Sequence, residues 1–236
     1  SEGTAAHALC EHKLKRRLKL RSDRPTSNWD SDEMEGYTDD YADFVIEQVI
    51  KERRRDADTQ VLIEQRLDFS CFVPDGFGTG DCIVVSKGRL HIIDFKYGQG
   101  VLVEAEDNPQ MKLYALGAIR QFGEQYEIKK VKMTIFQPRR ENVSTWETTA
   151  AKLKRWAEKD LKPKAEKAYK AKVEKEAKAE SKNEEKVKVE EKTEKKAEAK
   201  KEEAKKESKK DKKVEEKKEE KAETKAEAKK DAKKEE

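Results

Sequence analysis

Cysteine is scarce in this sequence, which has three (Cys10, Cys71 and Cys82) among 236 residues. No two are spaced as C-x-x-C, and all three fall on segments expected to be helix or strand, so we expect buried free thiols in a reducing compartment. No apolar run approaches the roughly 20 residues that a transmembrane helix needs. The first residues also lack the pattern of a signal peptide. Together these absences favour a cytoplasmic protein without membrane contact.

A surplus of either charge is also missing from residues 1–164, which carry 28 basic and 28 acidic residues. Residues 165–236 are different, with 27 lysines, 23 acidic residues and no glycine, proline, cysteine or tryptophan. No apolar heptad runs through them, so a coiled coil is not expected. We predict one domain over residues 1–164 and a low-complexity Lys/Glu/Ala tail over 165–236. The tail is either disordered or an isolated charged helix.

Residues 1–164 alternate between helical and strand patterns. The predicted strands are 60–73, 81–87, 89–97 and 129–137, with a tight hairpin turn at Lys87-Gly88. The predicted helices are 2–20, 39–55, 108–122 and about 146–162, and 21–36 reads as a polar loop. Thr38 is the expected N-cap of the second helix, whose inward residues are Val45, Ile46, Val49 and Ile50. This order predicts an α/β domain with a small mixed sheet flanked by helices.

Two acids fall near the ends of neighbouring strands. Asp81 starts the second predicted strand and Asp94 comes near the end of the third. In an antiparallel pair these positions lie side by side, so the carboxylates are expected to meet at one edge of the sheet. Paired carboxylates repel unless a proton or a cation lies between them. Mg²⁺ prefers a few carboxylates together with waters and phosphate oxygens.

A lysine accompanies the second acid. Asp94 and Lys96 are two residues apart on a strand, so their side chains share a face. Together they can flank a water that attacks phosphorus, with a metal lowering the pKa of that water and Lys96 stabilising developing charge. Two further pairs are each one helical turn apart, His7 with Glu11 and Gln110 with Tyr114. This set indicates a metal-dependent phosphodiesterase.

Each piece has an ordinary structural alternative. Asp94 and Lys96 alone would be a solvated pair, and Gly80-Asp81 alone would be a turn. His7 and Glu11 could form only an i, i+4 hydrogen bond. We assign no functional role to His91, which should lie on the strand face opposite Asp94, and Glu64 remains open as a fourth acid near the site. The ordered combination carries the functional prediction.

That combination resembles a known family, the PD-(D/E)XK nucleases. The histidine and the Q-x-x-x-Y motif make it most similar to the RecB-like exonuclease branch. The stretch from Tyr97 through Gln110, together with 113–117, looks especially like a phage and prophage subfamily of that branch. The resemblance covers about residues 1–163. It is carried by Gly3-Thr4-Ala5-Ala6-His7-(x)3-Glu11, Gly80-Asp81, Ile93-Asp94-Phe95-Lys96, Tyr97-Gly98-Gln99-Gly100, Asn108-Pro109-Gln110 and Leu113-Tyr114-Ala115-Leu116-Gly117.

The resemblance implies a restriction-endonuclease-like core of order αβββαβ and a role for each matching residue. The implied metal ligands are His7, Asp81, Asp94 and the backbone carbonyl of Phe95. Lys96 would be the catalytic lysine, Gln110 and Tyr114 would brace the site and contact nucleic acid, and Glu11 would support His7. The implied cofactor is Mg²⁺ or Mn²⁺. Many members hold an iron–sulfur cluster, but no cysteine follows Cys82, so we expect none here.

Two classes of function stay open at this point. The first is a metal-dependent deoxyribonuclease, expected to be an exonuclease of phage or mobile-element DNA metabolism. It would be phage-encoded or bacterial, with DNA and a phage recombination or replication protein as partners. The second is a non-catalytic nucleic-acid-binding or scaffolding module that keeps the fold. The acid pair with a lysine favours the nuclease, because a binding module has no need of it. The neutral charge of residues 1–164 argues against tight autonomous binding.

Overall fold

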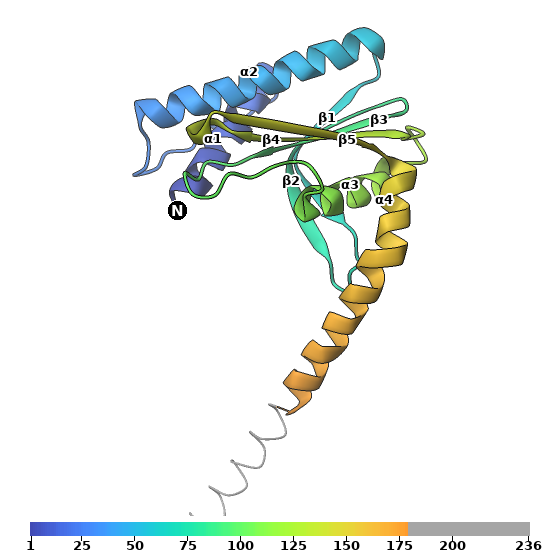
Figure 1. Ribbon diagram of the computed structural model, residues 1–236. Coiled ribbons are helices and arrows are strands. Elements are labelled where there is room, and N and C mark those ends of the chain that lie inside the picture. The colour runs from blue at the N-terminus through green and yellow to red at the C-terminus, as the bar shows by residue number, and fades with distance from the viewer. Residues whose placement is uncertain (179–236) are drawn as a thin grey trace, which may run out of the picture. The chain divides into compact units, whose positions relative to one another are not determined.

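A five-stranded mixed sheet organises the chain, seen in a computed structural model that describes residues 1–178 (Figure 1). The strand order is β1-β2-β3-β4-β5; β3 and β4 are parallel, and the other neighbours are antiparallel. The strands are β1 Gln60–Asp68, β2 Phe77–Ser86, β3 Arg89–Phe95, β4 Lys130–Gln137 and β5 Asn142–Thr149. The helices are α1 Glu2–Arg17, α2 Asp32–Arg55, α3 Pro109–Phe122 and α4 Ala150–Trp156. The predicted mixed α/β class is therefore confirmed.

The two N-terminal helices begin at serine caps. The first N–H groups of a helix have no carbonyl partner within the helix. The side chains of Ser1 and Ser31 supply that partner by accepting hydrogen bonds from the N–H groups of Thr4 and Met34. The predicted start of the second helix at Asp39 was wrong, since α2 begins at Asp32. Thr38, the expected cap, is buried inside the helix, and its hydroxyl donates to the Met34 carbonyl at 2.7 Å.

The inward face of α2 also differs in part from the prediction. Val45 and Val49 are fully buried, as expected, whereas the side chain of Ile50 is 47% exposed. The earlier start of the helix adds Met34 to the buried stripe, which also contains Tyr41 and Ala42. This stripe, and not Ile50, holds α2 against the sheet.

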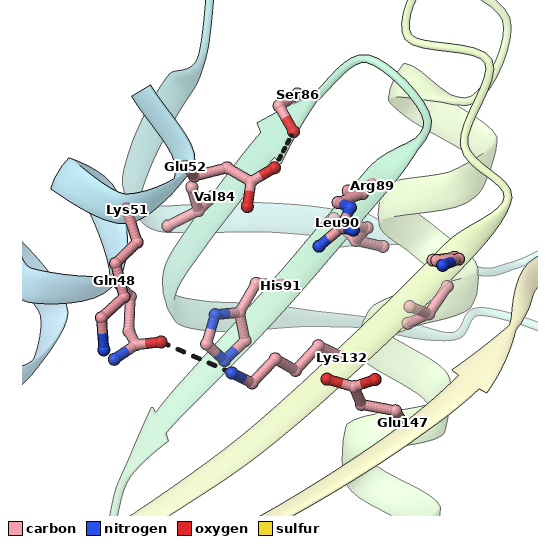
Figure 2. A pocket seen from close by; sticks show the side chains of 12 residues that line it. Gln48, Lys51, Glu52, Val84, Ser86, Arg89, Leu90, His91, Lys132 and Glu147 are labelled. Carbon is pink, nitrogen blue, oxygen red and sulfur yellow. Dashed lines mark hydrogen bonds between the residues drawn. The ribbon is translucent and has the colours of Figure 1, made fainter. Parts of the chain in front are cut away.

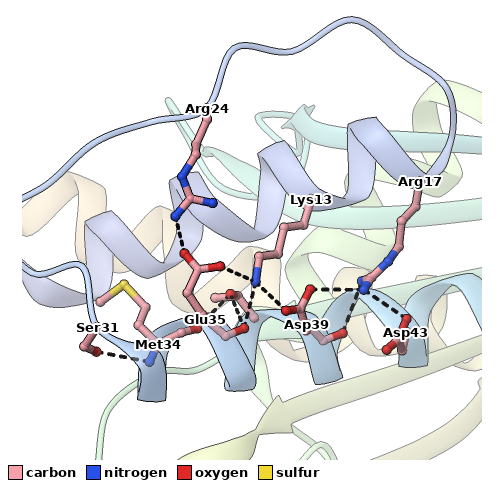
Figure 3. A network of polar contacts seen from close by, with 9 residues as sticks. Lys13, Arg17, Arg24, Ser31, Met34, Glu35, Asp39 and Asp43 are labelled. Atoms are coloured by element: carbon pink, nitrogen blue, oxygen red, sulfur yellow. Dashed lines mark hydrogen bonds and ion pairs between the residues drawn. The ribbon is translucent and has the colours of Figure 1, made fainter.

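A network of ion pairs joins α1 to α2 (Figure 3). Lys13 Nζ lies 2.9 Å from both Glu35 Oε2 and Asp39 Oδ2. Arg17 reaches Asp39 and Asp43, each at 3.1 Å. Because Lys13 is largely buried, these contacts satisfy a cation that would otherwise be costly to bury. They join α2 to α1, the helix that carries His7.

The predicted hairpin between β2 and β3 is confirmed, with Gly88 in the left-handed region at φ 78°. The boundaries of the preceding strands were less well predicted. Pairing of β1 with β2 continues to Asp68 and Phe77, so Asp81 lies inside β2 and not at its start. β1 ends at Asp68, which leaves Cys71 exposed in the turn, contrary to expectation. Cys10 and Cys82 are buried free thiols, as expected.

The fifth strand was missed. β5 pairs antiparallel with β4, and Trp146, the expected start of a helix, lies opposite Met133 in this pairing. Exposure alternates along β5, which is typical of an edge strand with one solvated face. The helix begins only at Ala150, where the Thr149 hydroxyl accepts a hydrogen bond from the Lys152 N–H.

Helices cover both faces of the sheet (Figure 1), and each face has its own core. One face packs against α3 and α4 and buries residues such as Ile83, Leu90 and Met133. The other packs against α1 and α2 and buries Val84, Ile93 and Phe95 among others. Successive residues of a strand point to opposite faces of the sheet, so one side chain faces α3 and the next faces α2. This determines which helices can reach each polar side chain of β2 and β3.

The chain divides into two units, with the boundary after Lys170. In the first unit, a π-helical turn at Ala157–Leu161 follows α4, and residues 162–170 are helical. In the second unit, residues 171–178 are helical, and the rest of the predicted tail lies outside the described residues. The predicted boundary at residue 164 stays a prediction. None of the helices within residues 1–178 has the length and apolarity to cross a membrane.

Two glycines inside helices provide a matched test of the packing. A Cβ at Gly117 would lie 2.9 Å from Leu67 Cβ, whereas a Cβ at Gly36 would meet nothing within 4 Å. We expect Gly117→Ala to lower the free energy of unfolding by about 1–3 kcal/mol through overpacking. Gly36→Ala should raise it by roughly 0.5–1 kcal/mol. Urea denaturation of both variants measures the difference, and equal effects would contradict the close packing of α3 on β1.

Candidate metal centre

The first element of the site is His7, carried by α1. Burial of Ala6, Leu9 and Cys10 fixes this helix against the sheet. The His7 ring meets the Phe95 ring edge-on, with 5.4 Å between centroids, and its Nδ1 lies 3.3 Å from Asp81 Oδ1. Burial alone would lower the pKa of His7. The hydrogen bond and the charge of Asp81, helped by other acids nearby, outweigh burial and raise that pKa above its usual value.

Asp81 lies where two central strands separate. The β2–β3 pairing ends at Cys82 and Ile93, so the next backbone groups of the two strands do not meet. The Asp81 carboxylate fills this gap, because its Oδ2 accepts the Phe95 N–H at 2.7 Å. The N–H and C=O of one strand residue point to the same side, so the Phe95 carbonyl is directed toward Asp81 as well. The two acids therefore lie on neighbouring strands at the fork where β3 ends, near enough for the charge of Asp81 to raise the pKa of Asp94.

Asp94 is the most buried acid of the site, with 2% of the residue exposed. Its Oδ2 lies 2.9 Å from Lys96 Nζ, as an ion pair. Lys96 is the one partner of this buried oxygen among the described residues, so a cation bound nearby would share the oxygen with the lysine. Burial and the Asp81 charge raise the pKa of Asp94, and Lys96 opposes that rise.

Lys96 begins a chain of polar contacts that ends on α3. Its Nζ donates to Gln110 Oε1 at 3.1 Å, and Gln110 Nε2 donates to the Tyr114 hydroxyl at 2.9 Å. The Tyr114 ring has room only because residue 78 is glycine, since a Cβ there would lie 2.5 Å from Tyr114 Cε1. The structure thus connects the residues of the predicted catalytic strand with those of the Q-x-x-x-Y motif.

Glu64 is the residue that the sequence left open. It is in β1, and the flanking pairs Ile63–Cys82 and Gln65–Gly80 place it opposite Asp81. Its φ of 51° is in the left-handed region, which is strained for a non-glycine residue and is often found at functional sites. Burial, followed by the charges of Asp81 and Glu11, raises the pKa of Glu64 to about 7. Nothing in the sequence signals this backbone conformation.

The donor set fits a hard divalent cation. One ligand atom from each of His7, Glu64 and Asp81 lies within 4.8 Å of the other two. Ligands on opposite sides of an octahedral Mg²⁺ are about 4.2 Å apart, so small side-chain adjustments would bring these atoms into its shell. Asp94 lies near enough for its charge to raise the pKa of His7. Of the predicted ligands, the structure groups His7 with Asp81 and adds Glu64.

Glu11 has a different partner from the one that the sequence suggested. Its Oε1 lies 2.5 Å from Lys15 Nζ, one turn along α1, and no hydrogen bond joins it to His7 in the described part of the chain. It acts on the site through its charge, which contributes to the raised pKa of Glu64. His91 lies on the α2 face with its Nε2 2.8 Å from Thr134 Oγ1, whereas Lys96 contacts α3, so the predicted separation of His91 from Asp94 holds.

The fold and this cluster define an α/β protein with a candidate cation site at a strand fork. The family model for a protein of unknown function, DUF2800, matches residues 1–233, and the chain belongs to that family. Among solved structures, one described as "Crystal structure of SSO0001" is 12% identical, with a TM-score of 0.25. The match covers 64% of this chain and 81% of the other. A likeness this weak carries no argument about function.

Metal binding should be measurable through stability. Mn²⁺ or Mg²⁺ placed among these acids would relieve their mutual repulsion, so we expect either ion to raise the melting temperature. Asp81→Asn and His7→Ala should abolish most of that rise, because each removes a donor of the cluster. Glu106→Gln, at an exposed acid outside the site, is the matched control and should keep the full rise. Equal metal-induced rises in all four proteins would place the cation elsewhere.

Proposed function

We propose that this protein is a metal-dependent nuclease of the PD-(D/E)XK type, hydrolysing phosphodiester bonds of DNA. The resemblance to the RecB-like branch makes exonuclease activity in phage or mobile-element DNA metabolism the specific form of the proposal. It also suggests a bacterial cytoplasm as the setting and a phage recombination or replication protein as a partner. The observation that carries the proposal is the placement of Lys96. Its amine is held between Asp94 and Gln110, beside the His7, Glu64 and Asp81 donor set.

The arrangement suits phosphodiester hydrolysis. A divalent cation bound there would lower the pKa of a water and polarise a phosphate oxygen. Lys96, whose side chain is 28% exposed, can reach a substrate while its amine stays fixed by two partners. Its charge is positioned to orient the attacking water and to stabilise negative charge that develops on the phosphate. The fixed position matters because the amine needs no reorganisation during the reaction.

Residues 1–164 carry no net charge, so their overall charge does not attract the phosphates of a nucleic acid. Binding must therefore depend on particular side chains near the site. Phe77 is 57% exposed, and the Arg66 guanidinium lies over its ring, 3.7 Å from the centroid. Phe77 precedes Gly78, against which the Tyr114 ring of the site packs. An exposed aromatic ring with an arginine is a surface on which bases stack and phosphates bind. We assign Phe77 and Arg66 to substrate contact on this basis.

Degradation of labelled linear DNA tests the proposal. Single- and double-stranded substrates would be incubated with Mn²⁺, Mg²⁺ or EDTA, and we expect cleavage only with a metal. Lys96→Ala and Asp94→Asn should each lower the rate by about 10²-fold or more. Lys129→Ala, at an exposed lysine outside the site, is the matched control and should cleave like the wild type.

The products distinguish the two modes of cutting, since mononucleotides indicate an exonuclease and longer fragments an endonuclease. Undiminished cleavage by folded Lys96→Ala would contradict the assigned role of the lysine. A folded wild type that binds DNA without cleaving it would favour the non-catalytic binding module instead.

The positioning role of Gln110 gives a separate prediction. Gln110→Leu removes the acceptor that holds the Lys96 amine, so we expect kcat to fall by roughly tenfold with little change in KM. Gln121→Leu, at an exposed position on the same helix, is the matched control and should leave both constants unchanged. A rise in KM with unchanged kcat would show that Gln110 only binds substrate.

A further inference from the structure

A pocket of about 240 Å³ lies between α2 and the sheet, and none of the residues of the candidate metal centre lines it (Figure 2). α2 contributes its C-terminal half to one wall, and β2, β3, β4 and β5 contribute the rest. The ionised side chains in the lining are Lys51, Glu52, Arg89, Lys130, Lys132 and Glu147. Four of these six are cations.

The pairing register explains why the cations gather there. β3 and β4 run parallel with Arg89 beside Lys130 and His91 beside Lys132, so these four side chains share the α2 face. Glu147 of β5 lies opposite Lys132 in the next pairing. Arg89 is far from Lys130 and Lys132 in the sequence, and the folded sheet brings it to the same pocket.

Most of the acidic charge near the pocket is already used. Glu52 lies 2.5 Å from Arg55 and accepts the Ser86 hydroxyl at 2.7 Å, and Lys51 pairs with Glu47 at 2.7 Å. Within residues 1–178, no carboxylate lies within ion-pair distance of Arg89, Lys130 or Lys132. Glu147 is therefore the one unpaired acid in the lining against three unpaired cations.

The half-buried polar groups of the pocket are also incompletely satisfied. Lys132 Nζ donates only a long hydrogen bond, 3.4 Å, to the neutral Gln48 amide (Figure 2). The His91 ring uses Nε2 for Thr134, and no hydrogen bond to its Nδ1 is present in the described residues. Burial and the nearby Lys132 lower the pKa of His91 to about 3, so the ring is neutral and adds no competing charge. An anion could accept from half-buried Lys132 and still reach Arg89 and Lys130, which are exposed at the start of β3 and β4.

We propose that this pocket binds a phosphate group, held by Arg89, Lys130 and Lys132. Arginine presents a planar fork that matches phosphate oxygens, and the lysines supply point charges. The pocket is smaller than the roughly 300–1,000 Å³ typical of drug-sized ligands, and no phenyl or indole ring lines it to stack a base. The phosphate belongs either to a small free anion or to the backbone of a nucleic acid. This proposal is independent of the nuclease activity.

Calorimetric titration of the full chain with inorganic phosphate tests the proposal. A chelator removes divalent cations, so that phosphate cannot bind through a metal. We expect saturable binding that weakens by about tenfold or more in the double variant Arg89→Gln/Lys132→Gln. Lys129→Gln/Lys154→Gln removes the same charge at exposed positions outside the pocket and should bind like the wild type. The wild type and both variants keep the lysines of residues 165–236. Any phosphate binding through those lysines is therefore the same in all three proteins.

A second titration with a short single-stranded oligonucleotide distinguishes the two sources of phosphate. Loss of inorganic phosphate binding in the pocket variant identifies a small-anion site. Loss of oligonucleotide affinity alone identifies a contact with a nucleic acid strand. The proposal is overturned if a pocket variant with wild-type melting temperature binds both probes as tightly as the control variant does. Absence of phosphate and oligonucleotide binding by the wild type overturns it equally.

Discussion

The hydrogen bond from the Phe95 N–H to the Asp81 carboxylate holds together the fork at which β2 and β3 separate. A backbone N–H freed inside a sheet is costly unless it finds a partner. Here an acid replaces the missing strand carbonyl, and the same carboxylate is thereby fixed next to His7 and near Asp94. The requirement to satisfy one backbone group thus positions the acid around which the candidate site is built.

Electrostatics gives the site its chemical character. Three acids, Glu64, Asp81 and Asp94, lie near one another, and their mutual repulsion together with burial raises the pKa of Glu64 and of Asp94. His7 and Lys96 compensate only part of this charge. A divalent cation would neutralise the rest of the negative charge of these acids. It would also attract the negative charge of a substrate phosphate to the site. The phosphate pocket on the α2 face has the opposite character, with unpaired cations around a neutral histidine.

Local signals in the sequence were enough to predict much of the fold. Gly88 marked the hairpin, and the helix predicted over 108–122 corresponds to α3, which the Asn108 side chain caps. The start of α2 was missed because Pro25, Asn28, Asp30 and Gly36 read as a polar loop, although Ser31 caps the helix and its first turn is acidic. β5 was missed because its alternation of polar and apolar residues is the weak pattern of an edge strand. The left-handed backbone of Glu64 depends on tertiary contacts. The gathering of Arg89 and Lys132 in one pocket depends on the pairing of β3 with β4, so a local pattern in the sequence could predict neither.

The most direct test of this account is the position of a bound cation. A crystal grown with Mn²⁺ and measured for anomalous scattering locates the ion without reference to any activity. The account predicts one strong peak at the β2–β3 fork, within coordination distance of His7 and Asp81 and beside Asp94 and Glu64. Mn²⁺ at another position, or a fork that stays empty at saturating Mn²⁺ with the same side-chain arrangement, would contradict the claim that this fork is a metal centre.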